Sequence, residues 1–428
     1  MTASAADAVA AWLNQHEGEL VAFRRDLHAH PELGRQEHRT TRAIAARLSA
    51  AGLTPHLLPA GTGLWCDIGP VCRDAASTAT ATATATADAA GPAASLDRPD
   101  VPMVMVRADI DALPLLDVKE VPYRSTVPGV CHACGHDVHT AVVLGAGLAL
   151  AEFARVSPLT GTVRLVFQPA EETMPGGALD VIDAGVLKPV SAAMTVHCDP
   201  SLDVGSIGLR VGPVTSAADS VRITLGGPGG HTSRPQNTVD LIYALSRLAV
   251  ELPAALSRLV DPRSSLSLVW GHIEAGTVAN AIPRAGSIAG TVRTLSRDTW
   301  EDVPTLVRRL AEQIVAPYGA SLALDYRRGV PPVVNSAEII EVFRTALQRV
   351  LAPGAEIPIM QSLGGEDFAW YLDHVPGALA RLGTRSPGGH TYDLHQGTFD
   401  VDEAAIGTGV RFLAASALRG LERASASC

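Results

Sequence analysis

Pro-Met-Val-Met-Val-Arg-Ala-Asp-Ile-Asp, residues 102–111, joins a continuous apolar run to two carboxylates. A strand covered by helices on both faces has such an uninterrupted apolar sequence. Two further runs, 162–167 and 192–196, have the same character, and helical patterns separate the three. This alternation predicts an α/β domain built on a mostly parallel sheet.

Each of these predicted strands is followed by side chains that can bind a metal or move a proton. Asp109 follows the first strand, Glu171 and Glu172 follow the second, and His197 follows the third. Because the carboxyl ends of parallel strands meet at one edge of a sheet, we expect these residues to converge there. Successive residues of an extended chain point oppositely, so one glutamate can bind metal while the other meets substrate or water. Two solvated loop glutamates are the alternative.

Residues 131–139, Cys-His-Ala-Cys-Gly-His-Asp-Val-His, concentrate side chains that hold zinc and similar metals. A chance polar cluster at a helix start is the plainer interpretation. A zinc ribbon is excluded for Cys131 and Cys134, because the chain has no second paired-cysteine motif. The apolar, small-residue stretch 140–154 predicts a helix after the cluster, with Asp137 as its N-cap.

A change in the order of predicted strands and helices along the chain predicts an inserted second domain. Residues 5–51 are mainly helical in pattern, and residues 214–328 follow the order β-α-β-β-α-β, which is typical of a ferredoxin-like α+β unit. The α/β domain is therefore expected in two parts, 1–213 and 329–428. An Ala-Thr repeat lies within residues 71–100, a low-complexity insertion that has almost nothing large to bury and to which we assign no role.

Composition narrows the possible partners and location. The 428 residues include 34 basic and 44 acidic side chains and no basic run, which argues against binding of nucleic acid or of an anionic membrane. Six cysteines in a chain of this size do not form the pattern of a disulfide framework. With no secretory leader pattern and no apolar run near the ~20 residues of a membrane span, the expected location is cytoplasmic.

Several longer motifs occur together in the order known from one enzyme family. They are RRDLHAHPELG (24–34), RADIDALP (107–114), HACGHD (132–137), FQPAEE (167–172), GGH (229–231), NAIP (280–283), GTVRT (290–294) and GEDF (365–368). With these motifs the chain resembles the aminoacylase-type dinuclear metallopeptidases. The most similar branch is the N-acyl-L-amino acid amidohydrolases, which includes hippurate hydrolases and hydrolases of indole-acetyl–amino acid conjugates. The resemblance implies a zinc-exopeptidase-like catalytic domain with an inserted lid domain that also dimerises.

The resemblance also implies roles for particular residues. Two divalent ions, zinc first, with manganese, cobalt or nickel as alternatives, would be bound by Cys134, His136, Glu172, His197 and His395, with the cysteine thiolate shared. Glu171 matches the general base that deprotonates the bridging water and later protonates the leaving amine. Asp109 would orient a metal-bound histidine. No ligand position matches Cys131, His132 or His139, which are interpreted as structural.

Residues of the inserted domain would complete the site. In the family, the residue matching His231 reaches the active site of the partner subunit and stabilises the oxyanion, so a homodimer or higher homo-oligomer is implied. Asn280 and Arg293 match positions at the carboxylate end of the substrate, although a structural salt bridge stays open for Arg293. The glycines at 364 and 365 are expected to let the backbone approach the substrate.

The chain departs from the family pattern in two places. His395 is followed by Gln396, where the branch has two consecutive histidines, and the insertion at 71–100 is atypical. The first histidine is the one that matches a ligand, so we expect the metal site to be retained.

Together these features predict a metal-dependent amidohydrolase that cleaves N-acyl-L-amino acids to a carboxylic acid and a free amino acid. A dipeptidase or a diaminopimelate-type deacylase using the same site remains open. A non-catalytic, metal-dependent ligand-binding protein is the alternative from another class. The joint presence of all five ligands with Glu171 and His231 favours the enzyme.

Overall fold

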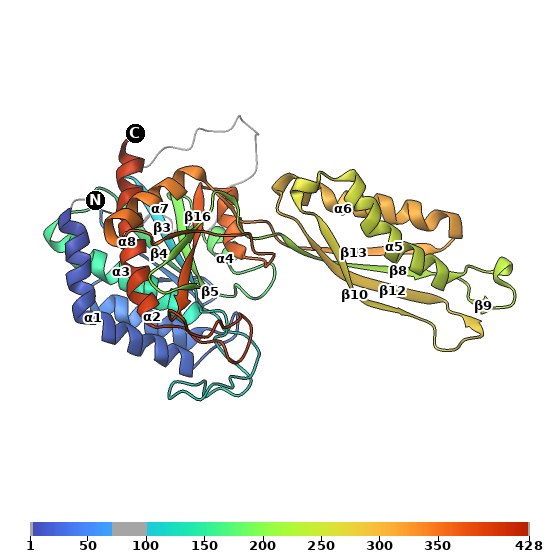
Figure 1. The fold of residues 1–428 in the computed structure, drawn as a ribbon, viewed down its shortest axis with the longest axis horizontal. Coiled ribbons are helices and arrows are strands. Elements are labelled where there is room, and N and C mark those ends of the chain that lie inside the picture. Colours follow the sequence, from blue (N-terminus) through green and yellow to red (C-terminus); the bar gives the residue numbers. More distant parts are fainter. Residues whose placement is uncertain (1–2, 71–100, 427–428) are drawn as a thin grey trace, which may run out of the picture.

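The computed structural model describes residues 3–70 and 101–426, which form a large α/β domain and a smaller α+β domain (Figure 1). The predicted insertion with its Ala-Thr repeat lies outside the described residues, as do Cys72 and Cys428. The large domain contains an eight-stranded sheet in the order β1-β2-β4-β3-β5-β16-β6-β15. Its strands are β1 (His56–Leu57), β2 (Leu64–Ile68), β3 (Met103–Asp109), β4 (Thr162–Gln168), β5 (Ala192–Asp203), β6 (Ile207–Leu209), β15 (Glu356–Pro358) and β16 (Gly377–Arg385).

The centre of this sheet is parallel, as predicted. β3 pairs in parallel with β4 and β5, and β5 pairs in parallel with β16, while β2 runs antiparallel to β4. The register sets Asp109 opposite Gln168 and His197 opposite Arg381. The carboxyl ends of β3, β4 and β5 therefore reach one edge of the sheet together.

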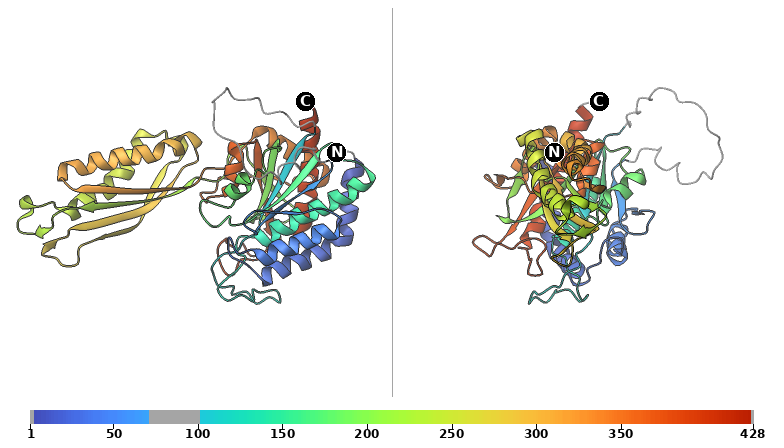
Figure 2. Two further views of the ribbon diagram at one scale, coloured as in Figure 1. Left: turned by 180° about the vertical axis from the view of Figure 1, so that it is seen from behind. Right: turned by 90° about the vertical axis from the view of Figure 1, so that its right-hand side faces the viewer.

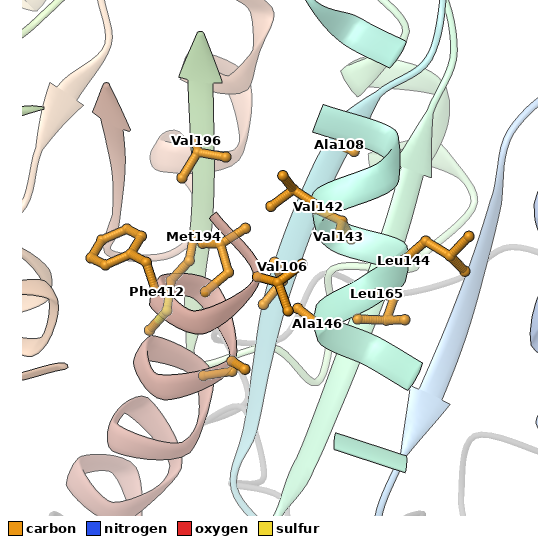
Figure 3. Packing of buried hydrophobic residues seen from close by; sticks show 14 of the residues in the cluster. Val106, Ala108, Val142, Val143, Leu144, Ala146, Leu165, Met194, Val196 and Phe412 are labelled. Atoms are coloured by element: carbon orange, nitrogen blue, oxygen red, sulfur yellow. The ribbon is translucent and has the colours of Figure 1, made fainter. Parts of the chain in front are cut away.

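Helices cover one face of the sheet and form the main core. They are α1 (Ala3–Ala29), α2 (His38–Ala50), α3 (His136–Val156), α7 (Ala337–Val350) and α8 (Ala404–Ala426). Figure 3 shows Val106, Leu165 and Met194 of the central strands beside Val142 of α3 and Phe412 of α8, all of them buried. Burial of this kind contributes about 25 cal/mol per Å² of apolar surface, so the helical layer fixes the sheet and its edge.

Helix α3 lies inside this core. Within the described part of the chain it is the one helix long and apolar enough, by length and composition, to cross a membrane, with a mean hydropathy of 1.3. Most of it is buried in the large domain, which accounts for its apolar character. At Gly147 an added Cβ would lie 2.2 Å from a methyl carbon of Leu165, so the small residue lets helix and sheet approach closely.

The opposite face of the sheet carries a second, smaller core. α4 (Ala178–Asp183) and the 3₁₀ helix η5 (Asp367–Asp373) cover it. Buried side chains there include Met105, Val166, Phe368 and Leu379. His197 and Arg381 point to this same face, because they lie an even number of residues from Ala193 and Leu379, which line it.

The small domain has the predicted β-α-β-β-α-β order: β8 (Ala218–Gly226), α5 (Leu241–Leu259), β10 (Ser267–Ala275), β12 (Ala285–Arg293), α6 (Arg297–Val315) and β13 (Ser321–Val330). Its antiparallel sheet has the order β10-β12-β8-β13, the ferredoxin-like arrangement. The side chains of Asp240 and Ser296 cap the two helices by accepting backbone N–H bonds. The fold class predicted from the sequence is thus confirmed.

The small domain extends away from one side of the large domain, which Figure 2 shows from two further directions. Its far end is a short two-stranded ribbon of β9 (Gly230–His231) and β11 (Ala281–Ile282). β9 is labelled at this far end in Figure 1. The segments next to β8 and β13 form the connection to the large domain.

The region 5–51 is mainly helical, as predicted. It consists of two helices, because the chain leaves α1 at Ala29 and passes through Arg35, whose φ of 65° cannot continue a helix. One local prediction was wrong. The N-cap of α3 is Gly135 and not Asp137. The Asp137 carboxylate is instead buried against Arg24 Nε, at 2.6 Å, and His28 Nδ1, at 2.8 Å.

Candidate metal centre

Residues from four segments gather at the carboxyl edge of the large sheet. Cys134 and His136 lie at the start of α3, Glu172 follows β4, and His197 lies in β5. His395 comes from the segment that precedes α8, and its N–H donates to the carbonyl of Ala133 over 2.8 Å. The convergence predicted from the strand ends is therefore present.

The five predicted ligands form two overlapping groups. Cys134, His136 and His197 bring one ligand atom each to within 4.8 Å of one another, and so do Cys134, Glu172 and His395. Cys134 Sγ lies 3.5 Å from His197 Nε2, and His395 Nε2 lies 3.1 Å from a Glu172 carboxylate oxygen. The Cys134 thiol belongs to both groups, which is the arrangement that a shared thiolate requires.

These residues fit divalent metal ions. His136 Nε2 is buried and has no hydrogen-bond partner among the described residues. Leaving a buried polar nitrogen unpaired costs about 1–3 kcal/mol, a penalty that a coordinated cation would remove. Imidazole, thiolate and carboxylate together form the donor set that zinc prefers. That these five residues bind metal remains a prediction.

Three backbone positions around the pocket adopt left-handed conformations. Gly135 has φ 89°, and an added Cβ would lie 2.7 Å from Cys198 Sγ, so only glycine fits between the two ligands. His395 has φ 61° and Ala170, just before Glu171, has φ 55°. The Ala170 N–H donates to buried Glu37 Oε1 over 2.8 Å, which holds this conformation.

Asp111, rather than Asp109, lies within hydrogen-bond distance of His136, the histidine that Asp109 was predicted to orient. Asp111 Oδ1 lies 3.1 Å from His136 Nδ1, and Asp111 Oδ2 accepts from the Glu172 N–H over 3.0 Å. The carbonyl oxygen of Asp111 also lies 3.0 Å from His136 Nδ1, so Asp111 contacts this predicted ligand through its backbone and its side chain, as partners of metal-bound histidines do. The closest approach of Asp109 to His136 Nε2 is 3.8 Å, too long for a hydrogen bond.

Asp109 acts on the site through a different histidine. Its Oδ1 lies 2.6 Å from His139 Nδ1, and His139 Nε2 accepts from the backbone N–H of Cys198 over 2.8 Å. This chain of bonds fixes the peptide that follows His197. His139 is therefore structural, as predicted, and the sequence signal for it is the histidine one turn after His136 in α3.

Glu171 lies beside the pocket in a position suited to proton transfer. It is buried, and one of its carboxylate oxygens is 3.9 Å from His136 Nε2. Burial raises the pKa of Glu171 well above its ordinary value, and the negative charges of Glu366, Glu172 and Asp367 add to this rise. A carboxyl with a raised pKa can both accept and return a proton near neutral pH.

Arg107 joins the carboxylates behind the pocket into one network. Its guanidinium lies 2.6 Å from Asp109, 3.1 Å from Glu366 and 2.7 Å from Asp367, all of them buried. A buried charge is stable only when paired and hydrogen-bonded, and this guanidinium supplies that pairing to three anions. The sequence motif 365–368 pointed to these acidic residues without indicating their partner.

A second group of possible ligands contains its own cation. His28, Asp117 and Cys131 also bring ligand atoms within 4.8 Å of one another. Lys119 Nζ, however, lies 3.0 Å from Asp117 Oδ1 and 3.6 Å from Cys131 Sγ. The ammonium group occupies the position that a metal would need, so Cys131 is structural.

Residues of the small domain divide between its two ends. His231 and Asn280 lie together on the β9–β11 ribbon, where the Thr232 N–H donates to the Asn280 carbonyl over 3.4 Å. Both are exposed at the end that points away from the large sheet (Figure 1). The chain's own pocket and its own His231 are therefore not brought together.

Arg293 and the two glycines lie at the opposite end, next to the large domain. An Nη1–H of Arg293 donates to the carbonyl of Leu363, beside Gly364. A Cβ added at Gly365 would lie 2.9 Å from Val330 and 3.0 Å from Ala218, at the connection between the domains. Gly365 thus permits a close approach of the connecting strands, a role that the sequence analysis had not assigned to it.

Comparison with known proteins gives consistent matches over most of the chain. Residues 105–419 match the model of Peptidase family M20/M25/M40. An N-acetyl-L-cysteine deacetylase of Bacillus subtilis (strain 168) is 36% identical over 413 residues, which cover 96% of this chain and 90% of that protein. A protein of Rhodococcus jostii (strain RHA1), named as a candidate glutamate–cysteine ligase 2-3, is 45% identical over 399 residues. These residues cover 93% of this chain but 46% of the relative, so the chain spans less than half of its length.

A solved structure has the same architecture. The crystal structure of a dinuclear metal binding peptidase of the M20 family from Bacillus subtilis superimposes with a TM-score of 0.78 and 33% sequence identity. The match covers 96% of this chain and 99% of the other. Both domains are therefore shared.

Proposed function

Because the chain belongs to Peptidase family M20/M25/M40 and is a hydrolase of amide bonds, we propose that it releases free amino acids from N-acyl-L-amino acids. The observation that carries the proposal is the pocket of five potential ligands with buried Glu171 beside it. The similar deacetylase named for N-acetyl-L-cysteine supports this substrate class.

The chemistry follows from the chain's own residues. Two divalent ions held by the five ligands would lower the pKa of a water molecule and polarise the scissile carbonyl. Glu171 accepts the proton of the attacking water, which its raised pKa favours, and then returns it to the leaving amine. Asp111 keeps His136 and Glu172 in place during this exchange through the hydrogen bonds of its carboxylate.

His231 is suited to stabilise the oxyanion of a partner subunit. Its Nδ1 accepts from the Ser233 backbone N–H over 3.1 Å, so in the neutral ring the proton is on Nε2. An exposed Nε2–H is a donor available to an oxyanion. Because His231 lies at the end of the small domain remote from its own pocket, we propose that a homodimer supplies it in trans, with Asn280 beside it.

The assay is release of amino acid from metal-loaded protein incubated with N-acetyl-L-cysteine, N-acetyl-L-methionine, N-benzoyl and N-indoleacetyl amino acids, and dipeptides. We expect release of carboxylic acid and amino acid in equimolar amounts. Chelation of the metal should abolish this release, and added divalent metal should restore it. Cleavage of dipeptides alone would replace the proposal with a dipeptidase. No release from any substrate, with two metals verified per chain, would refute it.

A further inference from the structure

A groove of the large domain opens directly beside the candidate metal centre. Its volume is about 690 Å³, enough for an acyl group of several carbons. The lining includes Cys198, which follows His197, and Leu394, which precedes His395. Every residue that lines it belongs to the large domain, from the segments 198–202, 358–362 and 391–394 and from Arg381 of β16.

Arg381 is the notable side chain in this groove. It is the register partner of His197 across the parallel strands β5 and β16, and paired residues share a face of the sheet. Its side chain is half-buried, yet the guanidinium forms no hydrogen bond or ion pair with any residue of the ranges 3–70 and 101–426. By contrast Arg385, four residues further along β16, is held by Asp203 over 2.6 Å.

Neither acidic residue of the groove forms an ion pair with Arg381, and both accept hydrogen bonds from other groups. Asp199 accepts hydrogen bonds from the backbone and the hydroxyl of Ser201, at 2.9 Å and 2.5 Å. Asp393 is exposed and accepts from the Leu394 N–H over 3.0 Å. The groove therefore presents one guanidinium whose donors are free, next to two acids that already have partners.

We propose that Arg381 binds a carboxylate carried by the acyl half of the substrate, so that the enzyme prefers N-acyl groups derived from dicarboxylic acids. This inference rests on the proposed amidohydrolase function. A guanidinium binds a carboxylate through two parallel hydrogen bonds, which gives both strength and orientation. The groove is assigned to the acyl half because the residues expected at the amino acid carboxylate, Asn280 and Arg293, belong to the small domain.

The test compares two substrates that differ only at the end of the acyl chain, N-succinyl-L-methionine and N-butyryl-L-methionine. The metal-loaded wild type is expected to have the higher kcat/KM for the succinyl substrate. Arg381→Met should lower the succinyl-to-butyryl ratio of kcat/KM by about 10- to 100-fold, the loss typical of a charged hydrogen-bonded contact. Arg385→Met, which removes a paired guanidinium from the same strand, is the matched control and should leave the ratio unchanged.

A third substrate, N-succinyl-L-methionine amide, identifies which carboxylate is bound. If Arg381 binds the acyl carboxylate, Arg381→Met still lowers kcat/KM for N-succinyl-L-methionine amide, which lacks the amino acid carboxylate. If Arg381→Met leaves kcat/KM for this amide unchanged, Arg381 binds the amino acid carboxylate and the acyl assignment is overturned. An equal loss for the succinyl and butyryl substrates would also overturn it, since Arg381 would then bind the amino acid carboxylate, which both substrates carry, or act through neighbouring His197 or the metal content. If the wild type hydrolyses N-butyryl-L-methionine and does not prefer the succinyl substrate, this inference alone is refuted. If it hydrolyses no substrate, the proposed function is refuted.

Discussion

Asp111 Oδ1 lies 3.1 Å from Nδ1 of His136, on the ring nitrogen opposite the unpaired Nε2 of the candidate metal pocket. The second oxygen of the same carboxylate accepts from the N–H of Glu172. The two elements that supply these ligands, the start of α3 and the end of β4, are thus joined through one side chain. These contacts lie behind the pocket, on the side of the ligands that faces away from the candidate metal positions.

Asp111→Ala should weaken metal binding without unfolding the large domain. Loss of a carboxylate behind a ligating histidine typically costs 10- to 100-fold in metal affinity. Competitive titration of the metal-free protein with a chelating dye measures this. Asp26→Ala, which breaks an exposed ion pair with Arg39, is the control and should bind metal as the wild type does. Equal affinities for Asp111→Ala and wild type would contradict the assigned role.

Gly135→Ala should destabilise the protein more than Gly129→Ala does. Both glycines have positive φ, 89° and 73°, but only at position 135 would the new Cβ meet an atom, Cys198 Sγ at 2.7 Å. Overpacking of this kind typically costs about 1–3 kcal/mol beyond the shared backbone strain. Urea unfolding of both variants isolates the steric contribution. If Gly135→Ala and Gly129→Ala lose the same free energy of unfolding, the close packing described around Cys134 and His136 is refuted.

His28 should make stability depend on pH on the alkaline side. Burial opposes its charged form, but Asp137 and Asp117 outweigh burial and raise the pKa of His28 to about 10. Below the unfolded value of about 6.5 the full stabilisation is present, and it is lost as pH rises from there through about 10.

The measurement is the melting temperature from pH 6 to pH 10. His28→Gln should be less stable at neutral pH, and its melting temperature should fall less steeply between pH 7 and pH 10 than that of the wild type. His30→Gln changes a half-exposed histidine that follows the same helix and should keep the wild-type slope. Parallel curves for wild type and His28→Gln would show that His28 is not the titrating group.

Mixing two inactive variants tests the trans role of His231. Glu171→Gln and His231→Ala should each be inactive alone, because each lacks one group of the composite site. In a mixed dimer one of the two sites contains Glu171 and receives an intact His231. Random exchange in a two-fold dimer would then restore roughly a quarter of wild-type activity. Absence of recovery in mixed dimers isolated with two different affinity tags would exclude this contribution.

Periodicity and strand ends were sufficient to predict the architecture. The apolar run at 102–106 is part of a strand buried on both faces. The β-α-β-β-α-β order predicted for 214–328 corresponds to the ferredoxin-like domain. The helical character of 5–51 was predicted, but the break between its two helices was not placed, although Pro31 and Gly34 lie within it. Asp137 was mistaken for a cap, since the sequence does not reveal that Arg24 and His28 would bury its carboxylate.

The candidate site could be predicted in part. The family motifs indicated the five ligands and Glu171, and the structure brings these residues together. They did not distinguish Asp109 from Asp111, because both follow the same strand and only the fold determines which carboxylate reaches His136. Arg381 had no sequence signal at all. Its proposed role depends on the absence of a side-chain partner in the described part of the chain, which is visible only once the neighbouring strands are in place.

Turnover of N-acyl amino acids by wild type and Glu171→Gln at matched metal content is the most direct test of the account. Glutamine keeps the size of the side chain but cannot accept a proton, so the variant should bind metal, fold as the wild type does and lose about 10²- to 10⁴-fold in kcat. Metal analysis and melting curves on the same samples establish that wild type and Glu171→Gln have equal metal content and stability. Turnover by Glu171→Gln within tenfold of the wild type would contradict the assignment of Glu171 as the general base.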